Sequence, residues 1–147
     1  MNEDAAEIVL VEDSPDDVDF FVHAFERAGL AARLHVIPDG AEALDFVFCA
    51  GRYADRNPAS RPNVIILDLK LPKVGGLEVL RRLKADPRTR TIPVVVLSSS
   101  QEERDLLASY ELGVNSYIVK PMDFDKYSES ARMIGQYWLH FNQTPRP

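Results

Sequence analysis

Four short apolar segments of this sequence each end at polar residues whose side chains can do chemistry. These residues are Glu12 with Asp13, Asp68, Ser98 and Lys120. In an open parallel sheet, ligands bind beyond the carboxyl ends of the strands, where the strand order reverses. If the four segments are parallel strands, three carboxylates, a hydroxyl group and an ammonium group converge on one crevice.

The chemistry of this set follows from its charges. Three carboxylates in one cleft repel each other unless a cation lies among them. Their oxygen atoms suit Mg²⁺, which keeps several waters and takes phosphate as a further ligand. Asp68 is the central carboxylate and can attack phosphorus to form an acyl phosphate. Lys120 and the metal would neutralise the transferred group, and Ser98 could hydrogen-bond to it. The set therefore predicts a Mg²⁺-dependent phosphoacceptor at Asp68.

Each of these residues also has a structural explanation when it is taken alone. Paired acids after a strand commonly complement a helix dipole. Ser98 is followed by two further serines, as in a turn, and Lys120 could be solvated. Their joint position at the ends of different strands is what favours the chemical interpretation.

The apolar segments that position these residues are short, rich in Val and Ile, and without polar alternation. This pattern is typical of strands buried on both faces of a parallel sheet. The segments are Ile8–Val11, Val64–Leu67, Val94–Leu97 and Tyr117–Val119, with a weaker fifth candidate at Leu34–Ile37. The alternation of strands with helical segments predicts an α/β fold, a doubly wound five-stranded parallel sheet with five helices.

Helix boundaries are signalled between the strands. Ser14, Asp39 and Ser100 are each followed by an acid three residues later, as at helix starts. Gly29 and Gly113 stand where helices would end. The last helix is expected from about residue 124 to about residue 141.

The organisation of the chain is that of one domain, predicted over residues 7–141. Residues 1–6 form an N-terminal tail and residues 142–147 a disordered C-terminal tail. An irregular insert at residues 50–63, with Gly, Pro and three Arg, is expected to be a surface loop between the second helix and the third strand.

Composition excludes several classes of protein. The 147 residues carry a net charge of −6, which argues against a nucleic-acid binder. Cys49 is the single cysteine, so no disulfide forms within the chain. No apolar stretch approaches the ~18 residues of a membrane span, and the acidic N-terminus is unlike a signal peptide. A cytoplasmic location, without membrane contact, is expected.

The motifs around these residues are similar to those of receiver domains of two-component response regulators. The matching segments are Val11–Ser14, Ile66–Leu69, Leu71–Gly76, Pro93–Ser98 and Tyr117–Pro121. The resemblance spans about residues 8–141. It implies a flavodoxin-like sheet with strand order 2-1-3-4-5.

The resemblance also implies roles for single residues. Asp68 matches the phosphoacceptor, and Glu12 and Asp13 match the acidic pair that binds Mg²⁺. Lys70 occupies the position whose backbone carbonyl meets the metal, and Lys120 that of the lysine that contacts the phosphoryl group.

Further residues match secondary features of the family. Ser98 matches the switch hydroxyl and Tyr117 the aromatic switch residue. The Lys120–Pro121 peptide bond is often cis in this family, and Gly75 with Gly76 fits a tight turn after the third strand.

Finer features resemble the single-domain regulators paired with phytochrome-type sensor kinases, which implies a histidine kinase as the phosphoryl donor. The insert shares this likeness, and so do residues 108–115 and 137–139. An apolar stripe along the last helix, wider than sheet packing needs, predicts a protein interface. We expect a homodimer through the fourth helix, the fifth strand and the fifth helix, as in these relatives. The interface residues are Leu107, Tyr110, Tyr137, Trp138 and Phe141.

Three other functions compete with a phosphorylation-dependent switch. An aspartate-nucleophile phosphatase usually carries a second Asp two residues after the nucleophile, where this chain has Lys70. A receiver-like module that works without phosphorylation is disfavoured by the intact acidic, hydroxyl and lysine set. A phosphate sink that drains its kinase stays open. Lys70 is expected to shield an acyl phosphate on Asp68 from water and to slow its hydrolysis.

Overall fold

The structure is a computed structural model that describes residues 6–145. Its centre is one sheet of five parallel strands in the order β2-β1-β3-β4-β5. The strands are β1 (Glu7–Val11), β2 (Arg33–Ile37), β3 (Val64–Leu67), β4 (Val94–Ser98) and β5 (Ser116–Val119). The predicted doubly wound sheet and its strand order are confirmed.

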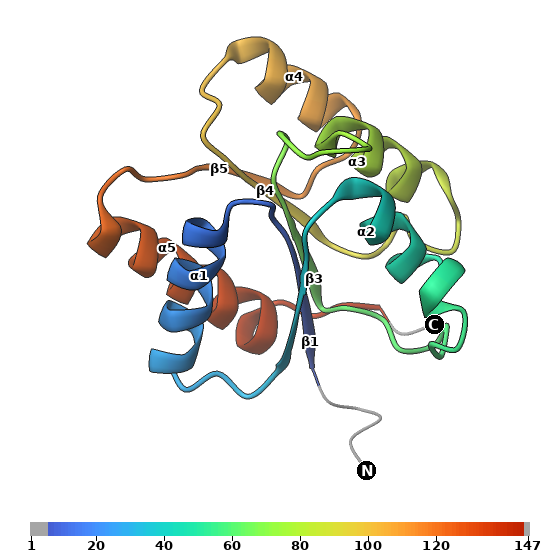
Figure 1. The fold of residues 1–147 in the computed structure, drawn as a ribbon, viewed down its shortest axis with the longest axis horizontal. Helices are drawn as coiled ribbons and strands as arrows, with labels where there is room; N and C mark the ends of the chain where they lie inside the picture. Colours follow the sequence, from blue (N-terminus) through green and yellow to red (C-terminus); the bar gives the residue numbers. More distant parts are fainter. Residues whose placement is uncertain (1–5, 146–147) are drawn as a thin grey trace.

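Helices cover both faces of this sheet (Figure 1). They are α1 (Pro15–Arg27), α2 (Gly40–Val47), α3 (Gly76–Ala85), α4 (Glu103–Glu111) and α5 (Phe124–Gln136). A turn of 3-10 helix, η1 (Gly51–Tyr53), follows α2, and a turn of π-helix, η2 (Tyr137–Phe141), ends α5. The helices α1 and α5 lie together on one face, and α2, α3 and α4 lie on the other.

The core is divided by the sheet into two apolar clusters. Phe21 of α1 and Ala131 of α5 belong to one cluster, and Ala43 of α2 and Leu80 of α3 belong to the other. Strands β1, β3 and β4 contribute alternate residues to both, and every residue of these strands is buried. This explains why their sequences show no polar alternation.

Two of the three predicted helix starts are confirmed by their caps. The Asp17 amide donates to Ser14 Oγ at 3.4 Å, and the Glu42 amide donates to Asp39 Oδ1 at 2.7 Å. The two predicted helix ends are also confirmed. Gly29 follows α1 with a φ of 65°, and Gly113 follows α4 with a φ of 99°. Such positive φ angles cost glycine nothing.

The predicted start of α4 at Ser100 is wrong by two residues, since the cap position is Glu102. The backbone of Ser100 is committed elsewhere: its amide donates to Ser98 Oγ at 3.2 Å, and its carbonyl accepts from Tyr117 Oη at 2.9 Å. These bonds hold residues 99–101 in a loop at the edge of the sheet, so the helix begins after them.

The insert at residues 50–63 is more than the surface loop predicted for it. Arg56 turns inward and keeps only 17% of its side chain exposed. Its guanidinium lies 3.8 Å from the ring centroid of Phe46 and donates to the Phe46 carbonyl at 2.7 Å. It also reaches Glu7 Oε2 at 3.5 Å, at the start of β1. Arg56 therefore ties the insert to the amino edge of the sheet.

Glu7 is a buried carboxylate that several groups satisfy at once. Arg33 Nη2 lies 3.2 Å from its Oε1, and Ser60 Oγ donates to the same oxygen at 3.2 Å. Burial favours the neutral acid, but His35 and the two arginines outweigh it, so the pKa of Glu7 lies below its ordinary value. The charged form of Glu7 is thus part of the folded state.

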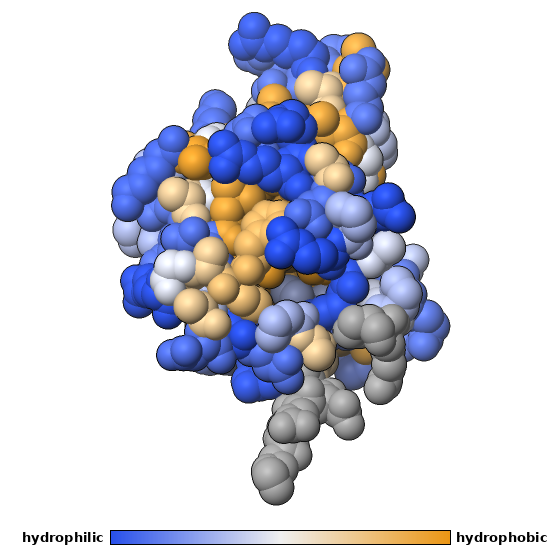
Figure 2. All heavy atoms as spheres, turned by 90° about the vertical axis from the view of Figure 1, so that its right-hand side faces the viewer, coloured by the Kyte–Doolittle hydropathy of each residue, from blue (hydrophilic) through white to orange (hydrophobic). Residues whose placement is uncertain are grey.

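Figure 2 shows the face on which α2 and the insert lie, where an apolar area is bordered by hydrophilic side chains. A pocket between the end of α2, the insert and the segment before β4 includes Phe48 and Cys49 in its lining, together with Arg88. Arg88 lies over the Phe48 ring, 5.1 Å from its centroid.

The predicted tails fall partly outside the described residues, which exclude 1–5 and 146–147. Residues 142–145 have no regular secondary structure, and disorder over residues 142–147 stays a prediction. Within the described part of the chain, no helix has the length and apolar character needed to cross a membrane.

Candidate functional site

The polar residues that follow β1 and β3 meet where the strand order reverses. The strands β2 and β3 lie on opposite sides of β1, so the loops after β1 and β3 leave a crevice between them. The Asp68 amide donates to the Val11 carbonyl at 3.1 Å, which holds the two strand ends together. Carboxylate oxygens of Glu12, Asp13 and Asp68 all lie within 4.8 Å of one another. The structure therefore brings the three predicted acids together.

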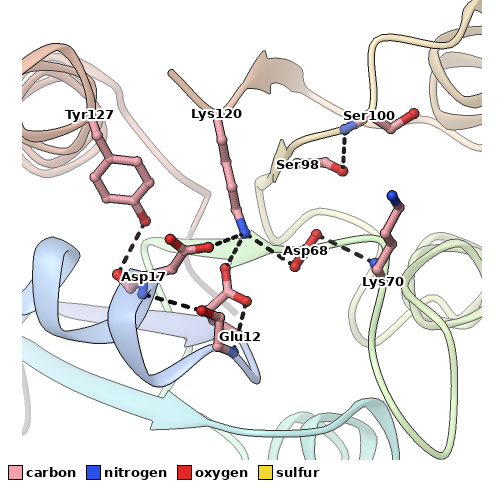
Figure 3. Close-up of polar contacts among 9 residues, drawn as sticks. Glu12, Asp17, Asp68, Lys70, Ser98, Ser100, Lys120 and Tyr127 are labelled. Atoms are coloured by element: carbon pink, nitrogen blue, oxygen red, sulfur yellow. Dashed lines mark hydrogen bonds and ion pairs between the residues drawn. The ribbon is translucent and has the colours of Figure 1, made fainter. Parts of the chain in front are cut away.

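Lys120 extends from the end of β5 into this acidic cluster (Figure 3). Its Nζ lies 2.5 Å from Glu12 Oε1, 2.8 Å from Asp17 Oδ2 and 3.2 Å from Asp68 Oδ2. Only 11% of the Lys120 side chain is exposed. The ammonium is thus a buried bridge between β5, β1, β3 and the start of α1.

The electrostatics of the site show more negative charge than one lysine compensates. Burial raises the pKa of Glu12 to about 7, and the charge of Asp68 adds to this effect against the hydrogen bond from Lys120. Burial opposes the charged form of Lys120, but its bonds to Asp17 and Glu12 outweigh it and hold the Lys120 pKa above its ordinary value. The site therefore contains one cation, whose charge does not balance that of the surrounding carboxylates.

The donor set fits Mg²⁺ as that second cation. Glu12, Asp13 and Asp68 supply oxygen ligands only, which hard divalent cations prefer. Glu12 and Asp68 are buried whereas Asp13 is exposed, so one side of the cluster is open to solvent.

Ser98 is buried at the end of β4, with 0% exposure. Its Oγ accepts from the Ser100 amide at 3.2 Å, which leaves the hydroxyl proton to donate elsewhere. Ser100 Oγ donates in turn to Asp105 Oδ2 at 2.5 Å, on α4. Together with the bond from Tyr117 Oη to the Ser100 carbonyl, this chain connects the site to α4 and β5.

Lys70 lies next to the Asp68 carboxylate. Its amide donates to Asp68 Oδ1 at 3.4 Å, and its side chain is exposed. In Figure 3 this side chain rises on the same side as Ser98 and Ser100. The ammonium group of Lys70 forms no hydrogen bond or ion pair with any of residues 6–145. The expectation of a cis Lys120–Pro121 bond is wrong, because the described chain contains no cis peptide.

The loop after β3 also differs from the expectation of a tight turn at two glycines. The positive φ of 67° belongs to Lys73, not to Gly75 or Gly76. Gly76 is needed for another reason: a Cβ there would overlap the carbonyl oxygen of Asp68. Gly75 has open space around its Cα. Of these two neighbouring glycines, only Gly76 therefore packs against the backbone of Asp68.

The sequence interpretation missed Asp17 as part of this site. Asp17 was assigned to a helix start, which is correct, but its carboxylate also pairs with Lys120. A signal was available, since a side chain in the first turn of α1 stands close to the carboxyl end of β1. Nothing in the sequence says which of Asp16 and Asp17 faces the crevice, because this depends on how α1 packs on the sheet.

The two glycines give a matched test of how the backbone positions Asp68. We expect Gly76→Ala to lower the free energy of unfolding by about 2 kcal/mol or more, because the new methyl group forces the Asp68 backbone aside. Gly75→Ala should cost less than about 1 kcal/mol, since it meets no atom. Urea denaturation followed by circular dichroism measures both, and equal losses would contradict this assignment.

Comparisons with known proteins agree with this geometry. The family model described as "Response regulator receiver domain" matches residues 8–132. The probable methanogenesis regulatory protein FilR2 of Methanothrix harundinacea is 41% identical over 99% of this chain and 91% of its own. Response regulator Rcp1 of Synechocystis is 39% identical over 90% of this chain and 88% of its own.

Solved structures give the same result. The Mn²⁺-bound form of Rcp1 matches with a TM-score of 0.88 at 37% identity, over 95% of this chain and 99% of that one. The phosphorylated cyanobacterial phytochrome response regulator RcpA matches with a TM-score of 0.89, also at 37% identity, over 96% and 99%. The chain accordingly belongs to the response regulator receiver family and is a two-component response regulator related to the phytochrome-associated regulators.

Proposed function

We propose that Asp68 accepts a phosphoryl group from the phosphohistidine of a sensor kinase. The observation that carries this proposal is the position of the Asp68 carboxylate, with Lys120 Nζ 3.2 Å from Oδ2 at the topological switch point. In the transfer, an Asp68 oxygen forms a bond to phosphorus while the bond from phosphorus to the histidine nitrogen breaks. The electron pair of that bond stays on the imidazole, which regains a proton from water.

The residues around Asp68 would stabilise this transfer electrostatically. Glu12, Asp13, Asp68 and the Lys70 backbone carbonyl would hold Mg²⁺, which would supply positive charge at the phosphoryl oxygens. Lys120 would supply a second cation to a phosphoryl oxygen. The Ser98 hydroxyl would donate to a phosphoryl oxygen, because its bond with the Ser100 amide uses Oγ as the acceptor. In this scheme the protein catalyses only its own phosphorylation and dephosphorylation.

The switch would run along the hydrogen bonds at the end of β4. A phosphoryl group on Asp68 that draws the Ser98 side chain toward itself would break the bond from the Ser100 amide to Ser98 Oγ, and Tyr117 is bonded to the same loop. A change in this loop would shift Tyr117 and α4 together. This supports a phosphorylation-dependent output at the surface formed by α4, β5 and α5, in preference to a receiver that works without phosphorylation.

The kinase input is proposed from the relatives. The similarity to Rcp1 and to the phytochrome response regulator RcpA favours a phytochrome-type sensor kinase as the phosphoryl donor. A cytoplasmic location fits such a kinase and the free thiol of Cys49. FilR2, a regulator named for methanogenesis, is of similar identity. Relatives of similar identity are thus named for different processes. A phosphate sink would place the same chemical requirements on Asp68.

The direct test is phosphotransfer from a purified, labelled histidine kinase. Wild type should take up the label in Mg²⁺ and lose this ability in chelator, because the uncompensated carboxylates repel the phosphoryl group. Asp68→Asn should take up none, whereas Asp45→Asn, a carboxylate on α2 outside the site, should behave as wild type. Labelling of Asp68→Asn at the wild-type rate would exclude Asp68 as the acceptor.

Lys70 gives a prediction for the lifetime of the acyl phosphate. An unpaired ammonium beside Asp68 can contact phosphoryl oxygens and exclude the attacking water. We expect Lys70→Asn to lose label about three- to fivefold faster than wild type, the size of an exposed charge contact. Lys73→Asn, an equal change of charge farther along the same loop, is the control. Equal lifetimes of wild type and Lys70→Asn would refute the shielding role.

We also propose a homodimer through α4, β5 and α5. Exposed apolar side chains support it: Leu107 and Tyr110 on α4, and Tyr137 and Phe141 on η2, are each at least half exposed. The strand β5 is the open edge of the sheet between the two helices (Figure 1). Trp138 has a mixed role, because it packs partly on the core and edge-to-face against Tyr137.

The oligomeric state tests this surface. Wild type should have the mass of a dimer by light scattering, and Tyr137→Ser with Phe141→Ser should be monomeric because the apolar contact is lost. Val36→Thr removes an exposed apolar side chain at the opposite edge of the sheet and should leave the dimer intact. A monomeric wild type, both with and without a phosphoryl donor, would exclude this interface.

A further inference from the structure

The ammonium of Lys120 has more partners than the proposed phosphoryl transfer requires. Two of them, Glu12 and Asp68, belong to the metal and acceptor set. The third, Asp17, comes from the first turn of α1, and its Oδ2 lies closer to Nζ than the nearest oxygen of Asp68, at 2.8 Å against 3.2 Å. In the unphosphorylated protein, the lysine is therefore shared with a carboxylate outside the metal-binding set.

The position of Asp17 is determined by contacts of its backbone. Its amide donates to Ser14 Oγ at 3.4 Å, which caps α1. Its carbonyl accepts from Tyr127 Oη at 3.3 Å, and Tyr127 is a buried residue of α5. These contacts fix the start of α1 relative to α5, so the Asp17 carboxylate is directed at Lys120 from a rigid base (Figure 3).

The three carboxylate partners of Lys120 differ in the free energy needed to break their ion pairs with the ammonium. The Glu12 side chain is 2% exposed and that of Asp68 is 8% exposed, whereas that of Asp17 is 27% exposed. A buried carboxylate that loses its cation stays desolvated, but a partly exposed one recovers water. When the ammonium turns to a phosphoryl group, the bond to Asp17 is therefore the one to break.

We propose that Asp17 is a positioning residue that withholds Lys120 from the phosphoryl group on Asp68. This inference rests on the proposed role of Asp68 as phosphoacceptor. Asp17 competes with the incoming phosphoryl oxygens for the same ammonium, and its negative charge also repels an anionic donor. Asp17 thereby sets a threshold for activation, because each phosphorylation has to break an ion pair that the resting protein makes.

The competition can be measured with beryllofluoride, a non-covalent analogue of the phosphoryl group. Its affinity is read from the bound signal in ¹⁹F NMR at saturating Mg²⁺. Asp17→Asn should bind it about tenfold more tightly than wild type, because one charged competitor for Lys120 is removed. Asp17→Glu, which restores the charge, should return the affinity toward the wild-type value.

Asp16→Asn is the matched control. Asp16 lies in the same helical turn, is exposed, and contacts no charged group in the described residues. Its substitution removes the same charge at the same helix end, so it reports any effect of net charge or helix dipole alone. The fold should survive Asp17→Asn because the Ser14 and Tyr127 contacts use the backbone of residue 17, and thermal unfolding checks this.

The outcomes separate this inference from the function on which it rests. If wild type binds no beryllofluoride, the phosphoacceptor proposal fails and this inference fails with it. If wild type binds and Asp17→Asn binds equally or more weakly, only the inference is overturned, and Asp17 then has no role or preorganises Lys120. Equal tightening by Asp16→Asn would also overturn it, because the effect would then be one of overall charge.

Discussion

An ammonium group within 3.2 Å of three carboxylates is the constraint around which the carboxyl edge of this sheet is organised. Lys120 comes from the edge strand β5, yet its charge lies beyond β1 and β3. It can reach that position only if the sheet has the order β2-β1-β3-β4-β5 and if α1 begins directly after β1. Without this cation, the buried Glu12 and Asp68 would have to lose charge or open the sheet to water.

Two polar connections run outward from this centre in opposite directions. One passes from Ser98 through Ser100 to Tyr117 and α4. The other passes from Lys120 through Asp17 to Tyr127 on α5. The helices α4 and α5 lie on opposite faces of the sheet, so a change of charge at Asp68 acts on both layers. Between these helices lies β5, which carries both Tyr117 and the approach to Lys120.

The fold was predictable from the sequence because its three inner strands, β1, β3 and β4, are buried on both faces. Uninterrupted runs such as Val64–Leu67 identify the strands, and their polar ends identify the site. The helix starts at Ser14 and Asp39 were predictable from local capping chemistry.

The features that were missed depend on contacts between distant segments. The start of α4 is delayed because Ser100 bonds to Ser98 and Tyr117, and the second of these is a tertiary contact. Asp17 pairs with a residue 103 positions away, and Arg56 with one 49 positions away. Neither pairing leaves a periodic or local pattern in the chain.

The buried acids at the two ends of β1 have a joint consequence for how this strand pairs with its neighbours. Glu7 is bound by cations at one end, and Glu12 by Lys120 just beyond the other. A slip of β1 by one residue would move it about 3.3 Å and reverse its faces. Both acids would then lose their partners at once, while an apolar strand of Ile, Val and Leu could tolerate the shift by itself. The two carboxylates therefore select one register for β1, which hydrophobic burial alone would leave poorly defined.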